Sequence, residues 1–242
     1  SAVSGILTVA LTYVFARRLF RSKEIALLSA AVLAVLPSHV FYSRLAMQES
    51  FSTMCLLAGF FFYFSRRKVS YFLLVSAVFF SAVYFTNYRM IVLPVLLAVF
   101  EYVQSLAEKR KVDWVKYGAT VVMFGAIVLG IGLLNNGSNL AITTAWMGHQ
   151  AEMAAAQVSW LNILSYPYSM IRLEGAIFSV LLIMNLYWLL KRDWQMLLPC
   201  SMVLTQMAIF TCASEKGARY LCVVLPFAAM AAALSVHTFL LK

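Results

Sequence analysis

Nine long apolar runs, separated by short polar segments, restrict the fold of this chain more than any other feature. They cover approximately residues 3–15, 25–36, 51–64, 71–85, 90–103, 117–134, 176–190, 197–212 and 220–241. A helix that crosses a bilayer needs about 20 mostly apolar residues, and shorter runs reach this length by including flanking polar or aromatic side chains. With 63% hydrophobic and 12% charged residues, the composition excludes an ordinary soluble domain. The sequence therefore predicts an all-α, polytopic transmembrane helical bundle with eight or nine membrane helices.

Basic residues concentrate on one side of the membrane if successive helix ends alternate between its two sides. Fourteen of them share one side: Arg17, Arg18, Arg21, Lys23, Arg66, Arg67, Lys68, Lys109, Arg110, Lys111, Lys116, Lys191, Arg192 and Lys242. The other side keeps five: Arg44, Arg89, Arg172, Lys216 and Arg219. Because an excess of Lys and Arg marks the cytoplasmic side, we expect the larger group to be cytoplasmic. The net charge of +10 then reflects topology and contact with anionic membrane lipids, and we expect no nucleic-acid partner.

The expected outer side carries three segments that differ from simple connectors, residues 38–50, 135–174 and 213–219. The middle segment is too long for a plain loop, and such loops are usually functional or carry structure of their own. Its stretch 147–160 is rich in Ala and Met, with Trp146 and Trp160 near the ends, which favours a helix lying in the membrane interface. We otherwise expect residues 1–242 to form a single transmembrane domain.

Arg44 and Glu49 lie between two apolar runs, in the loop Ser-Arg-Leu-Ala-Met-Gln-Glu-Ser at residues 43–50. A charge in or near hydrocarbon costs about 2.5–3.5 kcal/mol unless it is paired or hydrated, so charges at this position suggest function. An anionic lipid phosphate at the membrane surface would suit the arginine, whose fork of donors matches phosphate. The alternative is that Arg44 only snorkels to the interface and Glu49 caps the following helix.

A second basic patch precedes the last apolar run and contains Lys216, Arg219 and Tyr220. Gly217 permits a tight turn there, and both cations face the same interface as Arg44. We predict phosphate binding for this patch rather than simple anchoring. Arg89, which follows Asn87 and Tyr88 at the outer end of a helix, fits a phosphate contact and an interfacial anchor equally well.

Metal binding receives little support from the sequence. His149 and Glu152 are three residues apart and could share a helical face, but a catalytic metal usually takes three protein ligands. His39 suits a polar surface position better than a catalytic one. We therefore assign no metal site and no certain cofactor, and leave a divalent metal near Glu49 open.

The order of these motifs resembles a known family. A basic turn at residues 17–23, a helix ending at Pro37, and the stretch from Tyr42 through Glu49 to Ser50 are similar to the second outer loop of GT-C membrane glycosyltransferases. The ending 215–220, followed by Pro226, is similar to the Arg-Tyr segment of the protein O-mannosyltransferase and aminoarabinose transferase group. The resemblance covers nearly the whole chain by helix order and loop placement.

The resemblance implies transfer of a sugar from a polyprenyl-phosphate donor to a glycan, lipid or protein acceptor on the extracytoplasmic side. In the family, an acidic residue in the first outer loop acts as the catalytic base, and the second loop supplies another acid near the site. Glu49 matches this second acid and is the candidate catalytic residue. Arg44, Arg89, Lys216, Arg219 and Tyr220 are the candidate contacts for the lipid phosphate. Because no residue here matches the first acid, we expect the chain to be an N-terminally truncated fragment that lacks the family's first helix and first outer loop.

Two other functions stay open at this stage. One is a transporter or flippase for polyprenyl-linked glycans, in which the outer arginines bind phosphate but no carboxylate does chemistry. It is disfavoured because no charged residue interrupts the middle of a helix, where transport sites commonly lie. The other is a noncatalytic membrane subunit. In each case we expect an integral protein of a prokaryotic cell membrane.

Overall fold

The computed structural model describes residues 1–45, 47–65, 71–135, 137–154, 160–211, 218–239 and 241. In order, its helices are α1 (Ala2–Phe20), α2 (Lys23–Val35), α3 (Pro37–Arg44), α4 (Gln48–Ser65), α5 (Phe72–Thr86), η1 (Tyr88–Val92), α6 (Leu93–Ala107), α7 (Trp114–Leu134), α8 (Ser138–Ala154), α9 (Trp160–Glu174), α10 (Ala176–Met184), α11 (Tyr187–Lys191), α12 (Trp194–Thr211), η2 (Ala218–Val224) and α13 (Leu225–Phe239). Here η marks a 3-10 helix. Within these described residues there is no strand, and the predicted all-α membrane bundle is confirmed.

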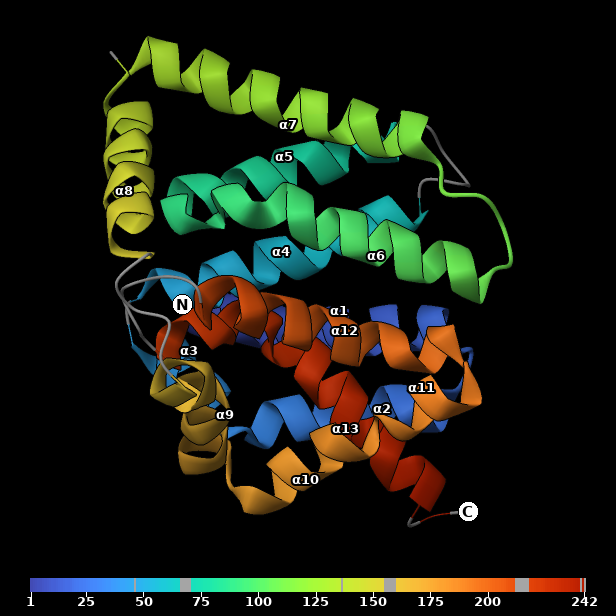
Figure 1. Cartoon of the computed structure of the whole chain (residues 1–242). Helices are drawn as coiled ribbons and strands as arrows, with labels where there is room; N and C mark the ends of the chain where they lie inside the picture. The colour runs from blue at the N-terminus through green and yellow to red at the C-terminus, as the bar shows by residue number, and fades with distance from the viewer. Residues whose placement is uncertain are drawn as a thin grey trace.

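The long helices lie side by side in a bundle (Figure 1). Helix α4 packs on α5 and α1, α5 packs on α7, and α12 packs on α6 and α13. Helix α8 crosses the ends of these helices, at the same end of the bundle as the N-terminus and α3 (Figure 1). The predicted interfacial helix at residues 147–160 overlaps α8, which runs from Ser138 to Ala154, while its residues 155–159 lie outside the described chain. Its position in the membrane interface stays a prediction.

The centre of the bundle is a cluster of phenylalanine rings from four helices. Phe60 of α4 lies 4.9 Å from Phe100 of α6 and 5.5 Å from Phe227 of α13, measured between ring centroids. Phe15 of α1 approaches Phe227 edge to face at 6.1 Å. Such tilted and edge-on pairs add stabilisation beyond the burial of their area. The cluster holds α1, α4, α6 and α13 together.

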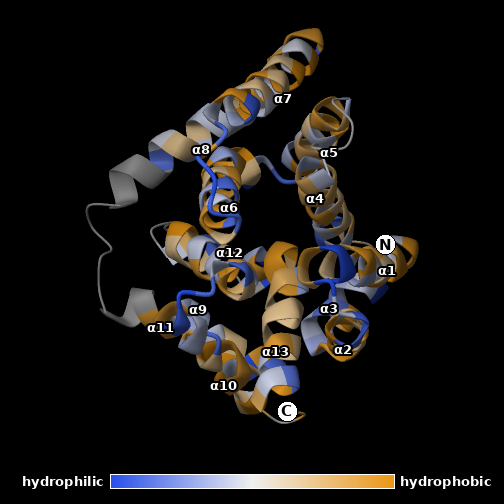
Figure 2. Ribbon diagram, turned by 90° about the vertical axis from the view of Figure 1, so that its right-hand side faces the viewer, coloured by the Kyte–Doolittle hydropathy of each residue, from blue (hydrophilic) through white to orange (hydrophobic). Residues whose placement is uncertain are grey.

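Apolar side chains also cover the outside of the bundle. Val115, Leu134 and Leu190 are each more than 80% exposed, at 82%, 83% and 82%. Figure 2, which looks along the bundle, shows hydrophobic residues on outward as well as inward helix faces. Extended apolar surface of this kind is unfavourable in water and favourable against lipid tails.

Four segments of the described chain are long and apolar enough to cross a membrane. They are Ala2–Phe20, Tyr88–Ala107, Trp114–Leu134 and Arg219–Phe239, and the bent pair of α2 and α3 makes a fifth. This number is smaller than the eight or nine predicted, because some apolar runs form helices that are shorter than a full span. Examples are α5, with 15 residues, and the stretch Ala176–Lys191.

Helices α2 and α3 meet at an angle of 59° because of Pro37. Proline has no N–H to donate and disfavours helical geometry in the residue before it. Leu36 accordingly takes an extended conformation, with φ −61° and ψ 124°, and Pro37 begins α3. The bend turns α3 across the end of the bundle.

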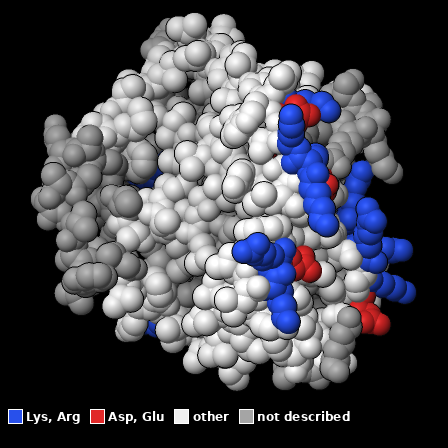
Figure 3. Space-filling model, turned by 45° about the vertical axis from the view of Figure 1, so that its right-hand side comes forward, with Lys and Arg blue, Asp and Glu red and all other residues white. Residues whose placement is uncertain are grey.

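Most of the charges visible in Figure 3 gather at one end of the molecule. We call this the basic end, and define it by the turns at residues 21–22, 108–113 and 192–193. Arg21, Lys109 and Arg192 in these turns adopt positive φ angles of 57°, 50° and 53°. The N-terminus, α3, η1 and η2 lie at the other end, which we call the α3 end (Figure 1). The membrane side that each end faces stays a prediction.

Candidate functional site

The candidate site lies at the α3 end, where four separate parts of the chain meet. Helix α3 contacts α4, η2 and α9, and η2 also packs on α4 and α12. These elements carry most of the charged side chains that the sequence predicts to lie opposite the basic end.

Glu49 is the most deeply placed of these charges. It occupies the first turn of α4 and is only 5% exposed. The positive end of the helix dipole favours a carboxylate at this position. Its Oε2 atom nevertheless accepts no hydrogen bond within the part of the chain that the structure describes. A buried carboxylate oxygen of this kind is costly, and it is often a sign that a ligand or ion completes the site.

Arg219 provides a countercharge for Glu49. Its guanidinium lies close enough to Glu49 and Tyr42 to interact electrostatically with both. Tyr42, on α3, in turn lies within range of Glu49, Arg219 and Glu174. A carboxylate from α4, a guanidinium from η2 and a phenol from α3 thus lie within electrostatic range of one another.

Arg89 joins the same region through Tyr220. Its guanidinium lies 4.8 Å from the centre of the Tyr220 ring, and that of Arg219 lies 5.4 Å from it. Tyr220 also stacks on Phe210, with centroids 5.2 Å apart, and hydrogen-bonds to the side chain of Arg219. The aromatic face lowers the electrostatic cost of holding two cations close together.

Two 3-10 helices place these arginines. Arg89 lies in η1 and Arg219 in η2, and each is followed by an α-helix with proline at its second position, Pro94 in α6 and Pro226 in α13. Proline is tolerated there because the first turn of an α-helix has no acceptor for its N–H. Pro94 and Pro226 therefore mark the change from 3-10 to α geometry.

Hydrogen bonds hold η2 against the neighbouring helices. Thr53 of α4 donates its hydroxyl to the Cys222 carbonyl at 3.2 Å, and Gln206 of α12 donates its amide to the Tyr220 carbonyl at 3.4 Å. Both donors are buried. These contacts limit the freedom of Arg219 and Tyr220 relative to Glu49.

Glu174, at the end of α9, is a second carboxylate of this region that was not predicted as a site residue. It accepts a hydrogen bond from the Ser38 amide at 3.4 Å. Burial raises the pKa of Glu174, and the Ser38 contacts offset this only in part. It also lies within electrostatic range of Tyr42 and Cys222. The only signal for Glu174 in the sequence was that acidic residues are rare, with nine in a chain of 242 residues.

The predicted site residues are thus only partly brought together. Glu49, Arg89, Arg219 and Tyr220 share one region, whereas Arg44 is exposed and lines a groove between α1, α2 and α3. No ion pair joins Arg44 to Glu49 in the described part of the chain. Lys216 lies outside the described residues. Among residues 1–45, 47–65 and the other described ranges, no three potential metal ligands come together, and the side chain of Glu152 is not described.

The fold and its outer surface define an integral membrane protein built from a helical bundle. The acidic and basic side chains of its candidate site lie at the α3 end. A family model, dolichyl-phosphate-mannose-protein mannosyltransferase, matches residues 1–131, more than half of the chain. The chain therefore belongs to this family of GT-C membrane glycosyltransferases. No curated protein and no solved structure matches it. The match includes Arg44, Glu49 and Arg89, while Arg219 and Tyr220 follow it in the sequence.

Proposed function

We propose that the chain forms part of an enzyme that transfers a sugar from a polyprenyl-phosphate donor to an acceptor on the extracytoplasmic side of the membrane. Membership of a membrane glycosyltransferase family supports the reaction class. The family name refers to dolichyl-phosphate-mannose and to protein mannosylation, which supports a lipid-phosphate donor and a protein as one acceptor beside a glycan or a lipid.

One observation carries the proposal: Glu49 is a buried carboxylate whose Oε2 atom accepts no hydrogen bond from the described residues, and it lies within electrostatic range of the Arg219 cation. A charged group is costly at a membrane boundary unless its partner is a ligand or another charge. A hydroxyl or amine of a sugar or acceptor is a donor that would satisfy Glu49 Oε2.

The cations then have a separate task. Arg89 and Arg219 flank Tyr220, and arginine is suited to bind phosphate through several donors at once. Lys216, close in sequence to Arg219, is proposed as a further contact. As the sugar leaves, negative charge develops on the lipid phosphate, and fixed cations stabilise that charge.

Glu49 has a positioning role in this proposal. By the family resemblance, the catalytic base belongs to a first outer loop that matches no residue of this chain, and Glu49 corresponds to the second acid. It would orient the donor or the acceptor for attack at the sugar carbon, while the base removes the proton of the acceptor. Since the described residues supply no complete set of metal ligands, no step is assigned to a metal.

The test uses a full-length protein that contains this chain. Glu49→Gln and Arg219→Ala are made separately, and transfer of labelled sugar from a polyprenyl phosphate is measured. We expect each to lower kcat by roughly 100-fold, the effect typical of losing one electrostatic contact in a transition state. Arg172→Ala is the matched control, because Arg172 is an exposed cation on α9 that was predicted on the same side.

Wild-type rates in both Glu49→Gln and Arg219→Ala would contradict the site. The reaction class is checked with the unaltered protein in sealed vesicles. Labelled product supports a transferase, whereas movement of the labelled lipid across the bilayer without product would instead identify a transporter. Binding without either result would indicate a noncatalytic subunit.

A further inference from the structure

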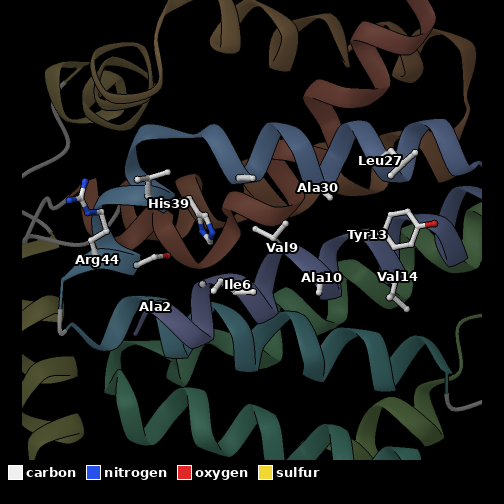
Figure 4. Close-up of a pocket in the computed structure, with 14 residues that line it drawn as sticks. Ala2, Ile6, Val9, Ala10, Tyr13, Val14, Leu27, Ala30, His39 and Arg44 are labelled. Carbon is white, nitrogen blue, oxygen red and sulfur yellow. The ribbon is translucent and has the colours of Figure 1, made fainter.

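A long groove runs along the outside of the bundle between α1 and α2 and ends at α3 (Figure 4). Its volume is about 740 Å³, within the range of roughly 300–1,000 Å³ that is usual for ligand sites. Its walls are almost entirely apolar, with Ile6, Val9 and Ala10 on α1 facing Leu27 and Ala30 on α2. The groove is therefore suited to a hydrocarbon chain.

Polar side chains occur at one end of this groove. His39, Ser43 and Arg44 of α3 line it there, and Figure 4 shows His39 and Arg44 at the end away from Leu27. The Ser43 Oγ atom has no hydrogen-bond partner within the described chain. The His39 ring is held in place by a hydrogen bond to the backbone of Gly5. A cation and a hydroxyl at the end of an apolar channel match a ligand with an anionic head and an apolar tail.

The length of the groove indicates which ligand fits. It follows α1 from Ala2 to Val14, which corresponds to about 18 Å of helix. One leaflet of the hydrocarbon core is roughly 15 Å thick, half of the whole core. A single acyl chain of a phospholipid would therefore fill the groove and bring its phosphate to Arg44. The Arg44 guanidinium can offer several hydrogen-bond donors to that phosphate.

Helix α3 separates this groove from the candidate site. His39 and Ser43, four residues apart, lie on the groove side, whereas Ser38 and Tyr42, also four apart, contact or face Glu174 and Glu49. Residues four apart share one face of a helix, so α3 uses two neighbouring faces for two regions. A ligand in the groove would press on the helix that positions Tyr42.

We propose that the α1–α2 groove is a binding site for an anionic phospholipid, with one acyl chain between α1 and α2 and the phosphate at Arg44, Ser43 and His39. The site is separate from the one proposed for the polyprenyl donor, although Arg44 was predicted as a contact for that donor. Its occupant holds α3 in place and thereby influences the position of Tyr42.

The site is tested with the whole chain in nanodiscs of phosphatidylcholine. A phosphatidylglycerol probe with a diazirine on its acyl chain is added, and labelled residues are mapped by mass spectrometry. We expect labels on Ile6, Val9 and Ala30, and on the order of tenfold less labelling by the corresponding phosphatidylcholine probe, because the choline cation of that lipid neutralises the phosphate charge that attracts Arg44. Arg44→Gln should remove this preference while leaving the labelled positions unchanged.

Ala10→Phe should block the labelling, because Ala10 lines the groove and is exposed. Ala126→Phe is the matched control: Ala126 is an exposed alanine on α7, away from the groove, and its substitution should change nothing. If Ala10→Phe fails to fold, as judged by helical content and size-exclusion chromatography, Ala30→Phe tests the opposite wall.

Two results would overturn the proposal. Equal labelling by the two probes would show that the groove holds bulk lipid without regard to charge. Complete competition by equimolar isoprenyl phosphate would show that the groove belongs to the donor instead. Because no sugar transfer is measured, either result leaves the proposed transferase function to its own test.

Discussion

Glu101 at the basic end offers a sharp test of how this bundle is stabilised. It lies in the second half of α6 and is fully buried, at 0% exposed. Its Oε1 atom lies 2.6 Å from Arg110 Nη1 and accepts a hydrogen bond from the Asp113 amide at 3.3 Å. Its Oε2 atom accepts one from the Tyr63 hydroxyl at 3.0 Å. Arg110 also donates to Glu108 at 2.8 Å, so one guanidinium ties the α6–α7 turn to the helix core.

The substitution Arg110→Met removes the cation but leaves the carboxylate. Burial alone would lower the pKa of Arg110, but its hydrogen bonds to Glu101 and Glu108 raise it above the ordinary value. Removing one partner of a buried pair costs about 3–5 kcal/mol. Because the Arg110 side chain is 22% exposed, water can partly replace it, and we expect about 2–3 kcal/mol. Replacing both partners, in Glu101→Gln with Arg110→Met, should cost less than the sum of the single changes.

The assay is a detergent titration to unfolding, followed by circular dichroism, for the two single variants and the double variant. Lys116→Met is the control, since Lys116 pairs with Asp113 at 3.3 Å in the same region but is 46% exposed. An exposed pair contributes about 0–1 kcal/mol. If Arg110→Met unfolds no more easily than Lys116→Met, or if the double variant equals the sum of the singles, the reasoning is wrong.

Three further changes have expected outcomes. Burial raises the pKa of Glu174 above its ordinary 4.5, so folding favours the protonated side chain. The stability that protonated Glu174 contributes is fully present below about pH 4.5 and is lost as the pH rises through the raised pKa. Glu174→Gln should therefore melt at a higher temperature than wild type near pH 7 and lose this advantage near pH 4; an equal difference at both would contradict it. Gly59→Val should lower the free energy of unfolding by about 1–3 kcal/mol, and the melting temperature with it, because a Cβ atom there would clash with the Phe80 ring. Asn185→Ala should cost a similar amount, about 1–3 kcal/mol, because its amide donates to the Ala231 carbonyl at 2.8 Å and to Ser235 at 2.9 Å; a wild-type melting curve for either variant would refute its explanation.

The helical membrane class was predictable because it depends on local composition. Each apolar run is a property of consecutive residues, and the bilayer requires helices of a known length. The same applies to the family, since the motifs at residues 17–50 lie within the matched range 1–131. The number of spans was harder to predict, because apolar runs such as 71–85 and 176–190 form helices that are shorter than a full span.

The candidate site shows the limit of this reasoning. Arg44 and Glu49 are five residues apart in one loop, and the sequence placed them together at the membrane boundary. The fold instead buries Glu49 within electrostatic range of Arg219, 170 positions further along the chain, and exposes Arg44 toward α1 and α2. The partners Tyr42 and Glu174 were not predicted, because their proximity depends on how α3 and α9 pack.

The sequence by itself determined that this chain is a helical membrane protein and to which family it belongs. These properties follow from hydrophobicity and charge, which act over short stretches of chain. Only the tertiary structure decided which charges meet and where a groove opens between α1 and α2. The physical reason is that a carboxylate at a membrane boundary requires a partner, and side-chain packing between distant helices determines whether a protein group or a ligand can fill that position.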